Sequence, residues 1–239
     1  MKATSKGRLF LIPTVLSPDT EAQVLPPQVP ETIRSLQHFL VENVRTARRF
    51  ISGLRLGISI ESLQFYELSK HTEVRQIEQY LDLAEQGHDL GILSEAGCPG
   101  VADPGARAVA GAHRRGIPVV PLVGPSSILL ALMASGFSGQ SFAFHGYLPI
   151  ASEARIKALQ GLEKEAQKHH QTQIFMETPY RNNPLLDDIL KACRPQTLLC
   201  VAANLTSPHQ LIQTQTVEAW RRTSADFHKI PAIFLLSAS

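Results

Sequence analysis

Cysteines are few in this sequence, and long apolar runs are missing. Cys98, Cys193 and Cys200 are scattered among 239 residues, and no two of them form a CxxC pair. A disulfide framework needs more cysteines at closer spacing, so we expect free thiols and a reducing, cytoplasmic environment. No run approaches the roughly 20 apolar residues of a membrane span. The apolar run at residues 9–13 is too short for a signal-peptide core, so we expect no membrane segment and no secretion.

Charge of one sign is also scarce. The 23 basic and 21 acidic residues leave a formal net charge of +2 with histidine taken as neutral. A protein that binds nucleic acid by charge alone carries a larger excess, so the total charge does not indicate such a protein, although it permits a local basic patch.

Several catalytic motifs are missing as well. The chain has no GxxxxGK(S/T), no GxGxxG after its first apolar run and no GxSxG. These absences argue against a P-loop nucleotidase, a common dinucleotide-binding fold and an α/β-hydrolase. No HExxH or cysteine-rich knuckle occurs and the nine histidines are dispersed, so we predict no metal site.

Apolar residues are plentiful, at 44% of the chain, which is enough for a sizeable core. Apolar runs alternate with amphipathic segments in the first half, which predicts βαβ repetition and a mostly parallel sheet. Near the C-terminus strands follow one another with little helix between them, which predicts a mixed sheet. We therefore predict an α/β fold in which residues 1–123 and 124–239 differ in sheet type, and the length of the chain fits one large domain or two small ones equally well. The expected strands are 9–13, 38–42, 90–93, 117–123, 173–176, 198–203, 210–214 and 230–236, the expected helices are 73–86, 106–115, 128–135, 152–170 and 184–192, and 14–30 is expected to be an irregular loop.

The most unusual segment is residues 94–105, which holds three glycines, two prolines and two carboxylates directly after a buried strand. Open α/β sheets bind ligands at the carboxyl ends of their strands, so this loop is a candidate site. Asp103 precedes a proline and suits either a helix N-cap or a ligand contact. Glu95 is either a solvated loop carboxylate or a functional one.

Five linked motifs carry a resemblance to a known family. The segments are S-E-A-G-C-P with D-P-G at 94–105, V-P-L-V-G-P-S at 120–126, H-G-Y-L-P at 145–149, F-M-E-T-P-Y-R at 175–181 and A-N-L-T-S at 203–207. In this order they resemble the tetrapyrrole methylase family. The pattern is most similar to the branch that 2′-O-methylates a cytidine of small-subunit ribosomal RNA, which reads S-D-A-G-T-P-x-x-x-D-P-G in the first of these segments.

The resemblance implies two α/β domains, S-adenosylmethionine bound in a cleft between them, and a homodimer. Cofactor contacts in the family come largely from backbone and small residues. Judged by its residue type alone, Met176 fits the filling of core volume better. Carried over motif by motif, the implied cofactor residues are Pro13, Ser94, Gly97, Cys98, Pro99, Ser126, Ser127, Met176, Ala203 and Pro231.

The chain departs from the family pattern mainly in polar motifs. Residues 13–19 lack the Gly-Asn pair of the branch, 42–46 read E-N-V-R-T in place of E-D-T-R-H, and 69–73 read S-K-H-T-E in place of H-x-H-N-E. Residues 203–207 also lose an Arg-Glu pair. Because the motifs assigned to the cofactor are better kept, the sequence predicts a methyltransferase with an altered substrate site.

Methyl transfer to a ribose hydroxyl needs an aligned and activated nucleophile. The candidate catalytic residues are Glu42, Glu95, Asp103 and His71. Glu42 also fits an ion pair with Arg45, and His71 also fits a plain polar loop. Arg45 and Arg181 are candidate substrate-binding residues, because an arginine recognises phosphate or carboxylate, although Arg181 also fits a surface helix charge.

The sequence is compatible with three functions. The first is a methyltransferase acting on ribosomal RNA, the second is one acting on a tetrapyrrole or other small molecule, and the third is a module that binds S-adenosylmethionine without catalysis. A basic rim favours RNA, whereas a closed apolar trough favours a small molecule.

Overall fold

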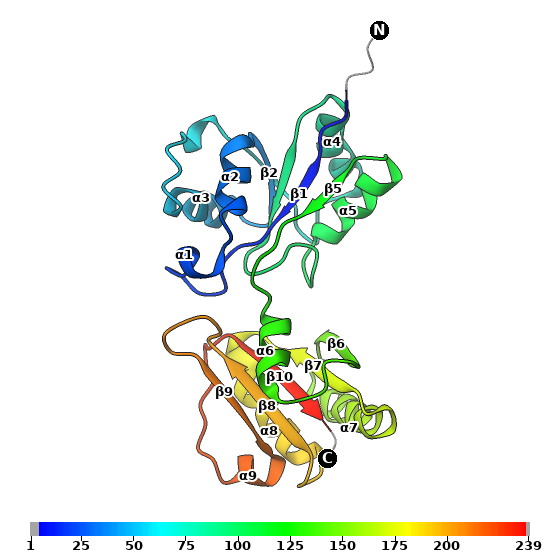
Figure 1. The fold of residues 1–239 in the computed structure, drawn as a ribbon. Helices are drawn as coiled ribbons and strands as arrows, with labels where there is room; N and C mark the ends of the chain where they lie inside the picture. The colour runs from blue at the N-terminus through cyan, green and yellow to red at the C-terminus, as the bar shows by residue number, and fades with distance from the viewer. Residues whose placement is uncertain (1–4, 238–239) are drawn as a thin grey trace. The chain divides into compact units, whose positions relative to one another are not determined.

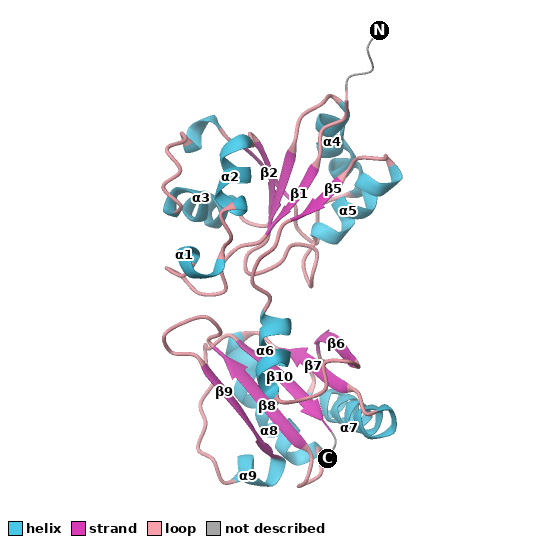
Figure 2. Ribbon diagram, in the orientation of Figure 1, coloured by secondary structure: helices cyan, strands magenta, loops and turns pink. Residues whose placement is uncertain are grey.

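The chain is divided into two compact parts. The computed structural model describes residues 5–237, and its two units are Met1–Pro125, called unit 1, and Ser126–Ser239, called unit 2. The predicted boundary between residues 123 and 124 lies two residues earlier. Each unit has its own sheet flanked by helices (Figure 2). Within the described residues, no helix has the length and apolar character to cross a membrane.

Unit 1 is built on a five-stranded sheet of order β3-β2-β4-β1-β5. All of its neighbouring strands run parallel, which confirms the predicted mostly parallel first sheet. The central strand β4 is buried along its whole length, as expected for a sheet covered on both faces. The strands are β1 (Leu9–Ile12), β2 (His38–Val41), β3 (Gln64–Glu67), β4 (Leu90–Leu93) and β5 (Val119–Pro121).

Helices cover both faces of this sheet (Figure 1). Ile33 and Ile51 pack against Phe39 on one face, and Ile77 and Leu81 belong to the core of the other. The helices are α1 (Glu21–Val24), α2 (Gln28–Ser35), α3 (Val44–Gly53), α4 (Val74–Glu85) and α5 (Gly105–Arg114), with a short 3₁₀ turn, η1 (Ile60–Ser62).

The prediction of an irregular loop over 14–30 is wrong. The segment contains α1 and the start of α2. Pro27 is the N-cap of α2 and Pro30 lies in its first turn. Proline is tolerated there because the first N–H groups of a helix have no intrahelical partner.

Unit 2 is built on a second five-stranded sheet, of order β6-β7-β10-β8-β9. The β6–β7 pair is parallel and the other pairs are antiparallel, so the predicted mixed sheet is confirmed. The strands are β6 (Phe142–Tyr147), β7 (Thr172–Met176), β8 (Leu198–Ala203), β9 (Leu211–Thr216) and β10 (Ala232–Ser237).

The helices of unit 2 lie on both sides of its sheet. Figure 1 shows α6 in front of the strands and α8 behind them. Behind the sheet, Phe175 and Phe234 stack with ring centroids 6.1 Å apart in a core that also holds Trp220. The helices are α6 (Ser127–Ser135), α7 (Ser152–His169), α8 (Asn182–Ala192) and α9 (Val217–Arg221), with a 3₁₀ turn, η2 (Pro179–Arg181).

A buried ion pair joins α7 to α8. The Arg155 guanidinium donates to Asp188 through Nε at 2.8 Å and Nη2 at 2.6 Å. Ser152 Oγ donates to the other Asp188 oxygen at 2.9 Å. The two charged side chains are only 5% and 4% exposed, so this carboxylate depends on its partners for stabilisation.

Candidate functional site

Polar residues gather at the carboxyl edge of the unit 1 sheet. Val41 at the end of β2 is paired in register with Leu93 at the end of β4. Glu42 and Ser94 therefore leave neighbouring strands at the same level. This edge is where open α/β sheets place their ligands.

Three of the four predicted catalytic residues come together here. Glu42, Glu95 and Asp103 interact electrostatically, and the pKa of Glu42 is raised by burial first and by the charges of Asp103 and Glu95 next. Burial also raises the pKa values of Glu95 and Asp103. Among the described residues no lysine or arginine forms an ion pair with any of the three. We call Glu42, Glu95 and Asp103 the carboxylate cluster.

Asp103 belongs to the cluster and also accepts backbone hydrogen bonds from its own loop. Its Oδ1 atom accepts hydrogen bonds from the backbone N–H groups of Gly100 at 2.6 Å and Gly105 at 2.8 Å. These bonds oppose the rise of its pKa. The N-cap position of α5 belongs to Pro104, so the predicted N-cap at Asp103 is displaced by one residue although the side chain still satisfies the first N–H of the helix. The second oxygen, Oδ2, has no hydrogen bond within residues 5–237.

Thr46 lies beside the cluster and was not among the candidates. Its hydroxyl lowers the pKa of Glu95 and so opposes the rise that burial causes. Thr46 lies in the first turn of α3, where its backbone N–H donates to the side chain of the N-cap residue Asn43 at 3.1 Å. An asparagine cap directly after a strand is the sequence signal that would have placed Thr46 at this edge.

Two loops at this edge are tied together by a short antiparallel bridge. The backbone N–H of Thr14 donates to Gly97 O at 3.0 Å, and the return bond measures 3.3 Å. Ser94 Oγ also donates to Gly97 O at 2.6 Å. Gly97 has φ +75°, and a Cβ there would lie 3.1 Å from Leu16 and 3.3 Å from the carbonyl oxygen of Pro125. Glycine is therefore required at position 97 by conformation and by space.

The loop after β5 is packed against the same bridge. Gly124 lies directly on Pro13, because a Cβ at position 124 would fall 2.2 Å from Pro13 Cγ. The Cys98 thiol donates to the carbonyl oxygen of Pro125 at 3.3 Å, and burial raises the pKa of this thiol. The bridge and the loop after β5 thus bring together four of the predicted cofactor residues of unit 1, Pro13, Ser94, Gly97 and Cys98, and Pro99 follows directly in the chain.

His71 and Arg45 do not join the carboxylate cluster. His71 is exposed in the turn after β3, and within the described residues its imidazole makes no hydrogen bond. Arg45 is exposed near the start of α3. No ion pair links it to Glu42 among residues 5–237, so the pairing that the sequence left open is not formed.

The predicted cofactor residues of unit 2 lie at one edge of its own sheet. Met176 ends β7 and pairs with Ile233 of β10. Ala203 ends β8, and the next residue donates its backbone N–H to Pro231 O at 2.9 Å. Ser126 caps α6 by accepting from the N–H of Leu129 at 3.4 Å, and Ser127 is the first residue of that helix.

Arg181 is engaged by a carboxylate beside this edge. Arg181 Nη2 donates to Glu177 Oε1 at 2.7 Å, and the backbone N–H of Thr178 donates to the same oxygen at 2.6 Å. The Glu177 side chain is 1% exposed, and these bonds hold its pKa below the ordinary value although burial opposes them. Arg181 Nε is buried and has no hydrogen-bond partner among the described residues. Glu177 was not a candidate, although it lies inside the fourth motif.

The carboxyl edge of unit 1 carries unpaired negative charge. Three carboxylates that lack basic partners favour a positive charge beside them. Among the described residues no three His, Cys, Asp or Glu side chains are arranged to hold a metal ion.

The sequence comparison identifies the family. The family model for tetrapyrrole (corrin/porphyrin) methylases matches residues 22–220. The chain belongs to the tetrapyrrole methylase family. This confirms the family that the five motifs predicted, and the two-sheet α/β architecture is that of this methylase family.

Individual relatives agree with this assignment. The methylase is 31% identical over 183 residues to the ribosomal RNA small subunit methyltransferase I of Vibrio cholerae serotype O1, covering 77% of this chain and 60% of the relative. It is 29% identical over 210 residues to the protein of the same name from Escherichia coli O157:H7, covering 87% of this chain and 68% of that one. The chain thus spans about 60% of the length of the first relative.

A solved structure shares the fold of this methylase. The crystal structure of the methyltransferase CobJ matches with a TM-score of 0.65 and 17% identity, covering 98% of this chain and 95% of the other. At this identity the match concerns the fold alone.

Proposed function

We propose that this protein is an S-adenosylmethionine-dependent methyltransferase that acts on a ribose 2′-hydroxyl in the RNA of the small ribosomal subunit. The observation that carries the proposal is kinship over most of the chain with proteins named ribosomal RNA small subunit methyltransferase I. Membership of a methylase family supports the reaction class. We further propose that the protein works in the cytoplasm as a homodimer, as the family resemblance implies.

The methyl donor is proposed to contact the small residues that the family motifs mark. S-adenosylmethionine supplies a methyl group bound to a positively charged sulfonium. In unit 1 the contacts are Pro13, Ser94, Gly97, Cys98 and Pro99, which the loop bridge holds in place. In unit 2 the proposed contacts are Ser126, Ser127, Met176, Ala203 and Pro231.

Glu42 is the proposed general base. A carboxylate with a raised pKa takes up a hydroxyl proton more readily than one with an ordinary pKa. Burial and the two neighbouring carboxylates raise the pKa of Glu42. A Glu42 carboxylate oxygen would accept the proton that the acceptor hydroxyl loses, while Glu95 and Asp103 hold the negative potential that favours this uptake.

The two candidate arginines differ in their suitability for RNA phosphate. Arg45 is exposed and forms no ion pair within the described residues, so its guanidinium is available to a phosphate. Arg181 already donates to Glu177. We therefore propose Arg45 as a phosphate contact and assign Arg181 to the support of the loop after β7.

A labelling experiment tests this function. The protein is incubated with tritiated S-adenosylmethionine and small ribosomal subunits from a bacterial strain that lacks its own enzyme of this name. We expect label in the ribosomal RNA and a 2′-O-methylated nucleoside after digestion. Glu42→Gln should label far less, whereas the matched variant Glu31→Gln, which changes an exposed glutamate of α2, should label normally.

The failures of this experiment are distinct. If label enters a tetrapyrrole but not RNA, the substrate is a tetrapyrrole and the proposed RNA substrate is wrong. Cofactor binding by calorimetry without transfer to any RNA or porphyrinoid would favour a binding module. Absence of cofactor binding would contradict the whole proposal.

A further inference from the structure

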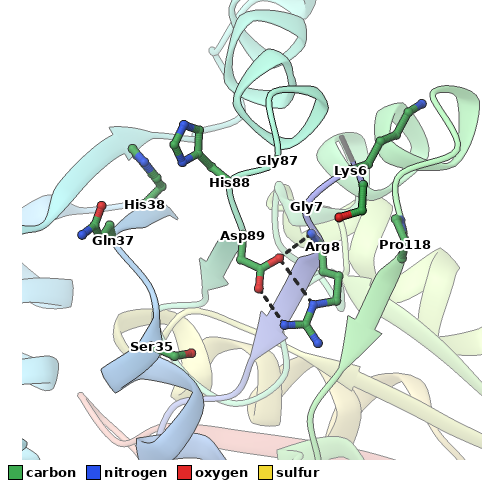
Figure 3. Close-up of a pocket in the computed structure, with 11 residues that line it drawn as sticks. Lys6, Gly7, Arg8, Ser35, Gln37, His38, Gly87, His88, Asp89 and Pro118 are labelled. Carbon is green, nitrogen blue, oxygen red and sulfur yellow. Dashed lines mark hydrogen bonds and ion pairs between the residues drawn. The ribbon is translucent and has the colours of Figure 1, made fainter. Parts of the chain in front are cut away.

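A pocket lies at the edge of the unit 1 sheet opposite the carboxylate cluster. It has a volume of about 660 Å³ and is lined at the amino ends of β1, β2 and β4 (Figure 3). The pocket lies at the amino ends of the strands and the carboxylate cluster at their carboxyl ends, so the two sites are about one strand length apart. Its volume falls within the range of small-molecule sites, roughly 300–1,000 Å³. Its charged and imidazole side chains are Lys6, Arg8, His38, His88 and Asp89, and its other polar side chains are Ser5, Ser35 and Gln37.

The single carboxylate of this pocket is already satisfied. Asp89 accepts from the backbone N–H of Arg8 at 2.7 Å, from Arg8 Nη2 at 2.7 Å and from Arg8 Nε at 3.4 Å. Figure 3 shows these bonds across the centre of the pocket. The Arg8 guanidinium is also held over the ring of Phe10, 4.8 Å from its centroid. Asp89 therefore has little capacity left to receive a donor from a ligand.

Donors in the pocket remain free. Arg8 Nη1 has no hydrogen bond within residues 5–237. Neither the carboxamide of Gln37 nor the imidazole of His88 has a hydrogen-bond partner among the described side chains and backbone. His38 uses Nδ1 toward Tyr66 Oη at 3.1 Å, which leaves Nε2 open. The site thus keeps unused donors at Arg8 Nη1 and at the Gln37 carboxamide nitrogen, and a phosphate oxygen can accept from both.

Two imidazole rings form one wall of the pocket, in which the His38 ring is stacked on Tyr66 and the His88 ring is exposed. The His38 and His88 rings meet edge to face with centroids 5.2 Å apart. Figure 3 shows both rings on the same side of the Arg8–Asp89 pair. Histidine rings offer stacking faces to unpaired bases. A ligand that bears both a phosphate and a base matches this combination of donors and rings.

We propose that this pocket binds a ribonucleotide, with its phosphate at Arg8 and its base against the His38–His88 wall. The nucleotide is either free or part of an RNA strand, and both present the same chemistry to the pocket. The proposal does not depend on the methyl-transfer function, because no residue of the carboxylate cluster takes part.

The test follows the histidine signals of the full chain by NMR during titration with uridine 5′-monophosphate. Uridine and ribose 5-phosphate are titrated in parallel. We expect the monophosphate to shift the His38 and His88 resonances with the tightest binding of the three, because each of the others lacks one recognised group. Equal binding of the monophosphate and uridine would overturn the phosphate assignment, and equal binding of the monophosphate and ribose 5-phosphate would overturn the base assignment.

Matched variants locate the site. His88→Gln should weaken binding about fivefold by loss of a stacking face, whereas His113→Gln, at an exposed position in the last turn of α5, should not change it. The double variant Arg8→Gln with Asp89→Asn removes the ion pair as a unit and should weaken binding about tenfold. Arg114→Gln removes a different exposed guanidinium that is paired with a glutamate, and it serves as the control. Equal binding by all four variants would overturn the proposal.

An unphosphorylated oligouridine identifies the source of the nucleotide. If it shifts the same histidines as the monophosphate, RNA is the ligand. If only the monophosphate does so, a free nucleotide is the ligand. Both results support recognition of a ribonucleotide phosphate at this pocket. A failure to bind any of these compounds would overturn the inference while leaving the methyl-transfer proposal intact.

Discussion

The two units differ in how their carboxylates are paired: those of the carboxylate cluster in unit 1 are half-buried or exposed, and Asp188 and Glu177 of unit 2 are buried. In unit 1, Glu42, Glu95 and Asp103 share one edge of the sheet without a basic partner among the described residues, and the pKa of each is raised. In unit 2, Asp188 and Glu177 each receive an arginine and further hydrogen bonds. The paired carboxylates of unit 2 hold parts of the fold together. The unpaired carboxylates of unit 1, at the carboxyl ends of strands, are available to bind a ligand or to accept a proton.

The largest effect that this contrast predicts is on the stability of unit 2. Asp188→Ala should lower the free energy of unfolding by about 3–5 kcal/mol, because it leaves the Arg155 guanidinium buried without its partner. Chemical denaturation followed by fluorescence of Trp220, which lies in the same unit, measures the loss. The neighbouring exposed Asp187→Ala should be nearly neutral, and equal losses in the two variants would remove the distinction between paired and unpaired carboxylates.

Methyl transfer should be most sensitive to substitutions in the carboxylate cluster of unit 1. Glu42→Gln should reduce methyl transfer about 100-fold, the lower range for loss of a general base. The fold should persist, because no ion pair is broken. Single-turnover labelling of the small subunit measures the rate and circular dichroism checks the fold. An unchanged rate would move the base function to Glu95, Asp103 or His71.

The stability that the Glu177–Arg181 ion pair contributes should depend on pH. Glu177→Gln should cost about 1–3 kcal/mol at pH 7, because a buried carboxylate with charged and backbone donors is replaced by a neutral amide. The folded-state pKa of Glu177 lies below its unfolded value. Its stabilisation is therefore fully present above the unfolded pKa and is lost as the pH falls through the folded pKa. Unfolding of both proteins from pH 7 down to pH 3 should show their difference shrinking with acid.

Glu42 should show a stability effect of the opposite sign and smaller size. Its folded-state pKa is raised, so ionisation costs the folded state free energy as the pH rises through that pKa. Glu42→Gln should therefore be more stable than the native chain at pH 7, by less than about 1 kcal/mol because solvent screens a partly exposed group. The gain should disappear in acid. A loss of stability at pH 7 would mean that Glu42 has a stabilising partner.

Much of the fold could be predicted from the sequence, because its central elements are buried. Strand β4 is predicted by its apolar run, and helix α4 is predicted by its regularly spaced apolar face. Strand β3 has no fully buried residue and β6 has none either, so their sequences carry no such pattern. Both lie at sheet edges, where pairing with a single neighbour stabilises the strand without a strong sequence signal.

The site was predictable where residues directly follow buried strands. Glu42 and Glu95 were chosen for that position, and parallel pairing brings them together. Thr46 and Glu177 were missed because their importance comes from proximity to a residue in another loop, for Thr46, and from hydrogen bonds with a neighbouring turn, for Glu177. The absence of an ion pair between Glu42 and Arg45 was equally invisible, since spacing within one segment does not determine which way two side chains point.

The thiol of Cys98 offers a chemical probe of the loop at residues 94–105. It is half-buried, whereas Cys193 and Cys200 are fully buried, and the pKa of the Cys193 thiol rises to about 12. A maleimide fluorophore would therefore react first at Cys98, beside the proposed methyl-donor contacts. The native chain thus carries its own attachment point for an optical sensor of ligand occupancy, and the rate of dye attachment would itself report whether that loop is covered.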